Sequence, residues 1–75
     1  MNRIEAFGVV IRDARLERGH TQEHLAELAG LHRNFISLVE RGASSAALDS
    51  IFALSDALEI PASELFERVE NLLRI

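Results

Sequence analysis

A glycine between two amphipathic segments, within residues 21–42, constrains the fold of this chain more than any other feature. Apolar residues follow helical spacing on both sides of Gly30, at positions 25, 28, 29, 31, 36 and 39. Gly30 can take the positive φ that a tight corner between two helices requires, and the small Ala26 lets a second helix cross close by. The side chains expected to fill the inside of this corner are Leu25, Leu31, Ile36 and Val39. The pattern predicts a helix-turn-helix, whose second helix enters the DNA major groove, although an ordinary αα-hairpin can share it.

The rest of the chain also follows helical periodicity, which predicts an all-α domain of five helices without strands. The expected helices run from residue 4 or 5 to 18, from 22 to 30, from about 32 to 41, from about 48 to just before 61, and from 61 onward. Gly19 lies just past the first helix, Thr21 is a good N-cap for the second, and Pro61 suits the first position of the last. Residues 43–46 form a loop or an early helical turn. The chain is therefore expected to be one domain, residues 1–75.

Apolar stripes on three of these helices predict the core. They consist of Ile4, Phe7, Val10, Ile11 and Ala14 in the first helix, Leu48, Ile51, Leu54, Ser55 and Leu58 in the fourth, and Leu65, Phe66, Val69, Leu72 and Leu73 in the fifth. A domain this small buries only about 60% of the surface of its unfolded chain, so a second subunit would add stability.

Several classes of protein do not fit the composition. The chain has no cysteine, which excludes disulfides and thiolate metal sites. His20, His24 and His32 could in principle form a metal cluster, but no carboxylate or second histidine lies at a ligand spacing that compels one, so we expect no metal and no cofactor. No apolar run approaches the ~20 residues of a membrane span, and the N-terminus does not resemble a signal peptide. These features predict a cytoplasmic protein without a membrane partner.

The formal net charge of −4 is unusual for a DNA-binding protein, but the charges are unevenly distributed. Residues 43–75 contain six acidic residues and two arginines, whereas residues 1–20 contain four arginines and three acidic residues. The acidic half is the half that a helix-turn-helix keeps away from DNA, where it would orient the approach of the protein. All cationic side chains are arginines, which suit bidentate recognition of phosphate and guanine.

Together, these residues resemble a known family. The matching positions are Gly8, Ile11-Arg12, Arg15, Gly19, Thr21-Gln22, Leu25-Ala26, Gly30, Ile36-Ser37, Glu40-Arg41-Gly42, Leu48, Ile51 and Leu58. The sequence is similar to the helix-turn-helix domain of the lambdoid phage repressors and Cro proteins over about residues 5–68. Within that superfamily, segments 30–37 and 63–66 most resemble the controller proteins of bacterial restriction–modification systems. The resemblance implies a dimeric transcriptional regulator.

The resemblance also implies which residues contact DNA. They are Gln22, His32, Arg33, Asn34, Phe35, Ser37, Arg41, Ser44 and Ser45. Arg33 offers a fork to guanine and Asn34 a pair of contacts to adenine, both from the first turn of the recognition helix. Gln22 opens the second helix, where its N–H group and side chain can face phosphate or a base edge, unless it is an ordinary solvated helix-start residue. Ser37 can reach phosphate or base, or it can bond to the carbonyl one turn earlier in its own helix.

Two positions depart from the controller pattern. Phe35 stands where those proteins often have tyrosine, which leaves packing as its expected role, or contact with a thymine methyl group. After Gly42 the controllers often carry basic residues and an asparagine, whereas this chain has Ala43-Ser44-Ser45. These serines can offer phosphate only hydroxyl and backbone N–H groups, which predicts a lower affinity and a weaker salt dependence. His32 replaces the usual Ser or Thr N-cap.

Two further predictions concern structure. Arg15 and Glu40 match a pairing in the phage repressors and are expected to form a partly buried ion pair. Phe52 falls outside the apolar stripe of the fourth helix, and the last helix has a wider apolar arc than packing of a core requires. The residues expected at a two-fold dimer interface of these helices are Phe52, Phe66, Val69 and Leu72. The alternative is a core wide enough to absorb them all.

The sequence therefore predicts a homodimeric regulator of transcription that binds a pseudo-palindromic operator in double-stranded DNA, with RNA polymerase as a further candidate partner. An antitoxin-like protein-interaction module, which binds DNA as a secondary act, is the alternative. An enzyme fits poorly, because the sequence shows no nucleophile–base pair, phosphate loop or paired carboxylates.

Overall fold

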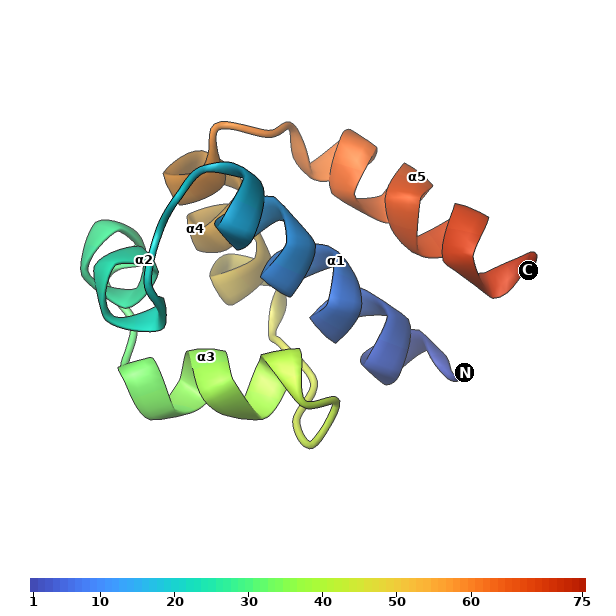
Figure 1. Cartoon of the computed structure of the whole chain (residues 1–75), viewed down its shortest axis with the longest axis horizontal. Coiled ribbons are helices and arrows are strands. Elements are labelled where there is room, and N and C mark those ends of the chain that lie inside the picture. Colours follow the sequence, from blue (N-terminus) through green and yellow to red (C-terminus); the bar gives the residue numbers. More distant parts are fainter.

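The computed structural model describes all 75 residues and contains five helices and no strand, as the sequence predicts. The helices are α1 (Arg3–Glu17), α2 (Gln22–Ala29), α3 (Arg33–Glu40), α4 (Leu48–Leu58) and α5 (Ala62–Leu73). Helix α1 runs through the middle of the molecule, with α3 along one side and α5 along the other, and it packs against both (Figure 1). Helix α2 packs against α3 and α4. The recognition helix predicted from the sequence, α3, therefore lies on the opposite side of α1 from α5.

Two helices begin one residue away from their predicted starts. Asn2 caps α1, because its Oδ1 accepts the Glu5 N–H (2.8 Å) while the Glu5 carboxylate accepts the Asn2 N–H (2.9 Å). This capping box lets α1 begin at Arg3 rather than at residue 4 or 5. Pro61 lies just before α5 as its N-cap, so that helix begins at Ala62. Such shifts are common, since the first turn depends on which side chain completes it.

The core consists of 14 buried apolar residues, and its largest fully buried members are Ile11, Leu25, Ile36, Val39, Leu54, Leu58 and Leu65. Ser55 is buried as predicted, and its hydroxyl donates to the carbonyl of Ile60. Ile60 itself is buried although it lies between α4 and α5, where helical periodicity cannot reveal burial.

Four members of the predicted stripes lie on the surface instead. The exposed fraction is 42% for Ile4 and 65% for Leu48, so the prediction that they belong to the core is wrong. Each lies in the first turn of its helix, where no neighbouring helix covers it. Phe66 and Leu73 are also exposed, because the arc of α5 is wider than the face that α1 covers.

The turn between α4 and α5 contains a strained residue. Glu59 has φ +56° and is the only non-glycine residue with positive φ. The left-handed conformation costs about 1–2 kcal/mol for a residue with a Cβ atom. Glu59→Gly should therefore raise the free energy of unfolding by about 0.5–1 kcal/mol. The gain is smaller than the strain that is relieved, because glycine also increases the entropy of the unfolded chain. Urea denaturation measures this change.

Glu59→Ala is the matched control, because it removes the same exposed carboxylate and keeps the strain. Both variants retain the Glu59 carbonyl, which accepts from Arg18 Nη2 (3.2 Å). Equal changes in the two variants would show that charge, and not backbone conformation, sets the effect.

Candidate nucleic-acid interface

The corner between α2 and α3 has the geometry that the sequence predicts. Gly30 adopts a left-handed conformation with φ +68°, and the Leu31 N–H donates to the Ala26 carbonyl across the turn (2.9 Å). Thr21 caps α2, because its Oγ1 accepts the N–H of His24 (3.0 Å). These local bonds set where α2 begins and where the chain turns toward α3.

Inside the corner, Leu25, Ile36 and Val39 are fully buried, which confirms their predicted positions. Leu31 is only half-buried, and Leu28 is 49% exposed although it follows the helical spacing. The corner is therefore held mainly by one residue of α2 and two of α3. Burial of their side chains fixes which face of α3 points outward.

The first turn of α3 points outward and carries the two residues predicted to contact bases. Arg33 and Asn34 are both exposed, and neither side chain forms a hydrogen bond or ion pair within the chain. His32 occupies the N-cap position with extended backbone, but its side chain makes no capping bond. All three side chains are therefore free to meet a partner.

Two predicted contact residues lie further along α3 at the edge of the core. Phe35 is half-buried and packs against the core, which supports packing as its role. Ser37 is half-buried, and its hydroxyl does not form the alternative bond to the carbonyl one turn earlier. The backbone carbonyl of Ser37 instead accepts from Arg41 Nε (3.3 Å).

The loop after α3 lies beside this helix. Gly42 has φ +71°, which ends the helical path, and Ser45 is exposed. The Ser44 hydroxyl donates to the Ser45 carbonyl (3.2 Å). Arg41 is exposed and carries the only positive charge of this loop region. The structure thus brings Arg41, Ser44 and Ser45 to one end of the α3 surface.

Gln22 differs from its prediction in one respect. Its side chain is half-buried, and Nε2 donates to Glu40 Oε1 (3.0 Å) rather than projecting freely into solvent. Glu40 also accepts from Arg15 in bidentate fashion, from Nε to Oε2 (2.7 Å) and from Nη2 to Oε1 (3.0 Å). The exposed fractions of these ion-pair side chains are 10% for Arg15 and 3% for Glu40. The predicted ion pair is present, and it includes a third side chain that the sequence did not indicate.

The ion pair keeps Arg15 charged. Its third nitrogen, Nη1, donates to the His20 carbonyl (2.9 Å), so the guanidinium is bonded on all sides. The hydrogen bond to Glu40 raises the pKa of Arg15 above its ordinary value, against the opposing effect of burial. Because this pKa is raised, the contribution of the Arg15 charge to stability is lost only as the pH rises through that raised, strongly alkaline pKa.

Acidic side chains gather on α4 and α5, away from α3. Arg68 of α5 bonds two of them on the surface, Glu64 (2.7 Å) and Glu17 of α1 (3.2 Å). Since α5 and α3 lie on opposite sides of α1 (Figure 1), the carboxylates of α5 are separated from the α3 surface, whereas Glu23 and Glu27 lie on α2 beside it. This separation favours approach of a polyanion from the α3 side.

The three histidines do not converge. The rings of His20 and His24 lie with their centroids 4.8 Å apart and their planes tilted by 60°, and His32 lies at the start of α3. No group of three or more His, Cys, Asp or Glu side chains has an arrangement that could hold a metal ion. None of the five helices is both long and apolar enough to cross a membrane.

A capped helix, a left-handed glycine corner and a second helix with an outward-facing polar first turn together define a helix-turn-helix DNA-binding domain. Comparison with known proteins supports this class. The chain belongs to the helix-turn-helix family, which matches residues 11–65.

Similar proteins within this family are regulators. Control protein C.BamHI of Bacillus amyloliquefaciens is 39% identical over 62 residues, which cover 81% of this chain and 76% of the relative. Transcriptional regulator ClgR of Mycobacterium tuberculosis is 30% identical over 77 residues, covering 93% of this chain and 69% of the relative. The crystal structure of the restriction-modification controller protein C.AhdI from Aeromonas hydrophila matches with a TM-score of 0.82 and 41% identity, covering 84% of this chain and 96% of that one. The protein is a DNA-binding transcriptional regulator.

Proposed function

We propose that the first turn of α3 reads bases in the major groove of duplex DNA. The observation that carries this proposal is the pair Arg33 and Asn34, both exposed and free of partners in the first turn of α3, while Ile36 and Val39 of the same helix are buried. Arg33 would donate two hydrogen bonds to guanine O6 and N7, and Asn34 would bond the N6 and N7 of adenine.

The remaining contacts would position the protein on the backbone. Arg41 would bond a phosphate, and the hydroxyls of Ser37 and Ser45 would act as neutral donors to phosphate oxygens. Ser44 would do the same by exchanging its bond to the Ser45 carbonyl for one to phosphate. Gln22 at the start of α2 would face another phosphate, where the helix N–H groups favour an anion. His32 lies beside the first turn and would add a further polar contact.

Arg33→Ala should weaken binding to the specific sequence by about 1–3 kcal/mol per half-site and relax the preference at one base position. Fluorescence anisotropy on a selected duplex and on random duplexes measures both effects. Arg18→Ala removes the same charge beside the α4–α5 turn and serves as the control. Equal losses on specific and random DNA would show that Arg33 contacts only phosphate.

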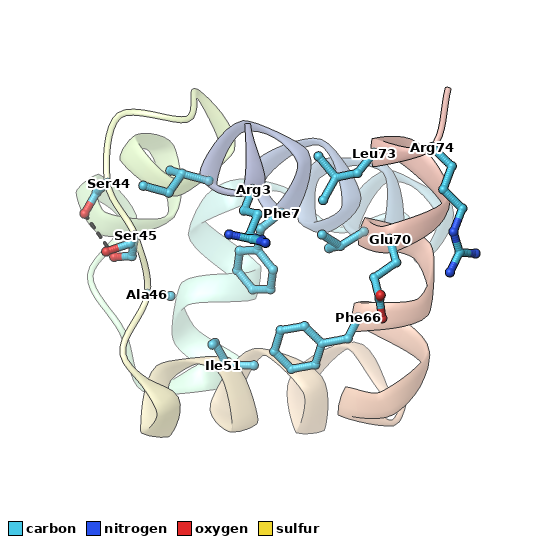
Figure 2. A pocket seen from close by; sticks show the side chains of 12 residues that line it. Arg3, Phe7, Ser44, Ser45, Ala46, Ile51, Phe66, Glu70, Leu73 and Arg74 are labelled. Carbon is cyan, nitrogen blue, oxygen red and sulfur yellow. Dashed lines mark hydrogen bonds between the residues drawn. The ribbon is translucent and has the colours of Figure 1, made fainter. Parts of the chain in front are cut away.

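We also propose that the protein acts as a two-fold homodimer through α4, α5 and the cleft between them and α1. This cleft has a volume of about 560 Å³, and Phe7, Ile51, Phe66 and Leu73 project toward it from three helices (Figure 2). Phe66 is 42% exposed at its edge, and Phe52 is 51% exposed on α4. So much exposed apolar surface is unfavourable in water, and a second copy of the chain would cover it.

Two of the predicted interface residues contribute differently. Val69 lines the cleft but is only 7% exposed and belongs to the core of the single chain, so little of its side chain is left for a partner. It points toward α1 because α5 packs on that helix. Leu72 is half-buried against the core, which leaves only part of its side chain for a partner.

Phe52→Glu should convert the dimer to a monomer at micromolar concentration, because a charge would replace an apolar contact at the interface. Sedimentation velocity measures the association state. Leu16→Glu is the matched control, since Leu16 is 52% exposed on α1 and lies outside the proposed interface. A monomeric wild type, or an equal effect of the two substitutions, would contradict the assignment.

A two-fold dimer would place its recognition helices at half-sites about 34–36 Å apart, so the operator should be a pseudo-palindrome. Because similar proteins are named as control or restriction-modification controller proteins, we propose that the regulated genes include those of a restriction–modification system. RNA polymerase is a further proposed partner. This role would be carried out in the cytoplasm by binding alone, without a catalytic step.

Selection of bound duplexes from a random-sequence pool tests the proposal. We expect an enriched pseudo-palindrome that occurs near the promoter of this gene or its neighbours. Enrichment of no sequence would contradict sequence-specific reading by α3. The antitoxin-like alternative would instead bind a protein partner through the acidic helices α4 and α5, with DNA binding as a secondary act.

A further inference from the structure

The side-chain amide of Gln22 has a defined orientation, and Glu40 determines it. Arg15 donates to both oxygens of the Glu40 carboxylate, and Gln22 Nε2 donates to Oε1 of the same group (3.0 Å). An ionised carboxylate can only accept hydrogen bonds, so the nitrogen of the Gln22 amide, and not its oxygen, must face Glu40. This requirement determines which end of the Gln22 amide is the nitrogen and which is the oxygen.

The orientation matters because phosphate oxygens also accept and do not donate. The amide nitrogen carries two hydrogens, of which Glu40 uses one, while the second has no partner within the chain. Gln22 is the first residue of α2, where backbone N–H groups already favour an anion. An unrestrained amide at this place would also present its oxygen, which repels phosphate.

We propose that Glu40 is a positioning residue for DNA binding, which holds Gln22 so that its second N–H is directed to a backbone phosphate. This inference rests on the proposed placement of the α2 N-terminus at the DNA backbone. Glu40 does not touch DNA itself, because its side chain is only 3% exposed. It acts through Gln22 while its charge is balanced by Arg15.

The same carboxylate joins three helices. Arg15 belongs to α1, Gln22 begins α2, and Glu40 is the last residue of α3. The phosphate contact and the recognition helix therefore share one anchor, so the base contacts of α3 and the backbone contact of α2 are held in a fixed relation. Loss of Glu40 would lower affinity for all sequences, since phosphate contacts carry no sequence information.

A double-mutant cycle on the selected duplex tests this coupling. Gln22→Met keeps the side-chain length and removes both N–H groups. Glu40→Gln keeps the shape of the side chain but replaces one acceptor oxygen with an NH₂ donor, so that the residue at position 40 no longer requires the Gln22 nitrogen to face it. Each should weaken binding by about three- to tenfold. The double variant should bind within about twofold of the weaker single variant, because both changes disable one contact. Binding is measured at low temperature, where circular dichroism shows each variant to be folded.

Glu27→Gln is the matched control, since Glu27 is an exposed carboxylate of α2 without a hydrogen-bonded partner, and it should not lower the affinity. If the losses of affinity of the two single variants multiplied in the double variant, the positioning role of Glu40 would be overturned, while the proposed DNA interface would stand. No loss for Gln22→Met would overturn the placement of α2 at the backbone as well.

Nuclear magnetic resonance of the wild-type protein gives a second readout that does not depend on the folding of a variant. In the free protein, one N–H of the Gln22 side chain should exchange slowly with solvent, because it is bonded to Glu40. On addition of the duplex, the other N–H should shift. Equal and fast exchange of both hydrogens in the free protein would overturn the inference.

Discussion

Gly8→Ala should lower the free energy of unfolding by about 3 kcal/mol, although alanine is the better helix former. Gly8 lies inside α1, where α3 ends against it. A Cβ atom at this position would overlap the carbonyl oxygen of Val39 and lie 3.0 Å from that of Glu40. Both are backbone atoms, so relief would require the two helices to separate, which costs about as much as overpacking a core.

The sign of the Gly8→Ala effect distinguishes crowding between helices from helix propensity. In an exposed helix the same substitution stabilises by about 1 kcal/mol through helix propensity. For a domain of this size, the expected loss would lower the melting temperature by more than about 10 °C. Thermal melting followed by circular dichroism measures it.

Gly30→Ala separates crowding from backbone strain. Gly30 has φ +68°, and a Cβ atom added at this position would have no other atom within 4 Å, so alanine there would be strained in its backbone but not crowded. We expect a loss of about 1–2 kcal/mol for that variant. If Gly8→Ala melted at or above the wild-type temperature, the close approach of α1 and α3 would be contradicted.

The sequence predicts the local features of this fold well, since they depend on neighbouring residues. Thr21 caps α2 because an oxygen near three free N–H groups suffices, and Gly30 turns the chain because a left-handed residue is needed there. The corner residues Leu25 and Ile36 follow from helical spacing, which itself reports the buried face.

Features that depend on distant parts of the chain could not be predicted in this way. Leu48 belongs to an apolar stripe but lies at the open end of α4, and Ile60 is buried only because the chain folds it under α4. Val69 has the same spacing as an interface residue, yet α1 covers it. Spacing shows that a face is apolar but does not show what covers it.

The candidate site shows the same division. The positions of Arg33 and Asn34 at the start of α3 followed from the resemblance and from the corner, and both are exposed. The bond between Gln22 and Glu40 joins the start of α2 to the end of α3, and no local pattern predicts it. That bond depends on the crossing of the two helices, which only the three-dimensional structure supplies.

Arg15→Met should lower the free energy of unfolding by about 3–5 kcal/mol, because it leaves a buried carboxylate without its counter-charge. Methionine preserves much of the side-chain volume, so the loss reports the interaction rather than a cavity. Glu40 would keep only the neutral bond from Gln22, and the His20 carbonyl would lose its donor. Urea denaturation at neutral pH measures this change. Since the pKa of Arg15 is raised by Glu40, the wild-type contribution should not vary across the neutral pH range.

Arg68→Met is the matched control, because Arg68 also bonds glutamates but does so on the surface. The exposed fractions of those side chains are 33% for Arg68, 45% for Glu64 and 59% for Glu17. Solvent screens such pairs, so the control should lose no more than about 1 kcal/mol. The same chemical change thus has a large effect where the charges are buried between α1 and α3 and a small one where water surrounds them. Similar losses for both variants would show that burial of Arg15 and Glu40 does not govern the stability of the domain.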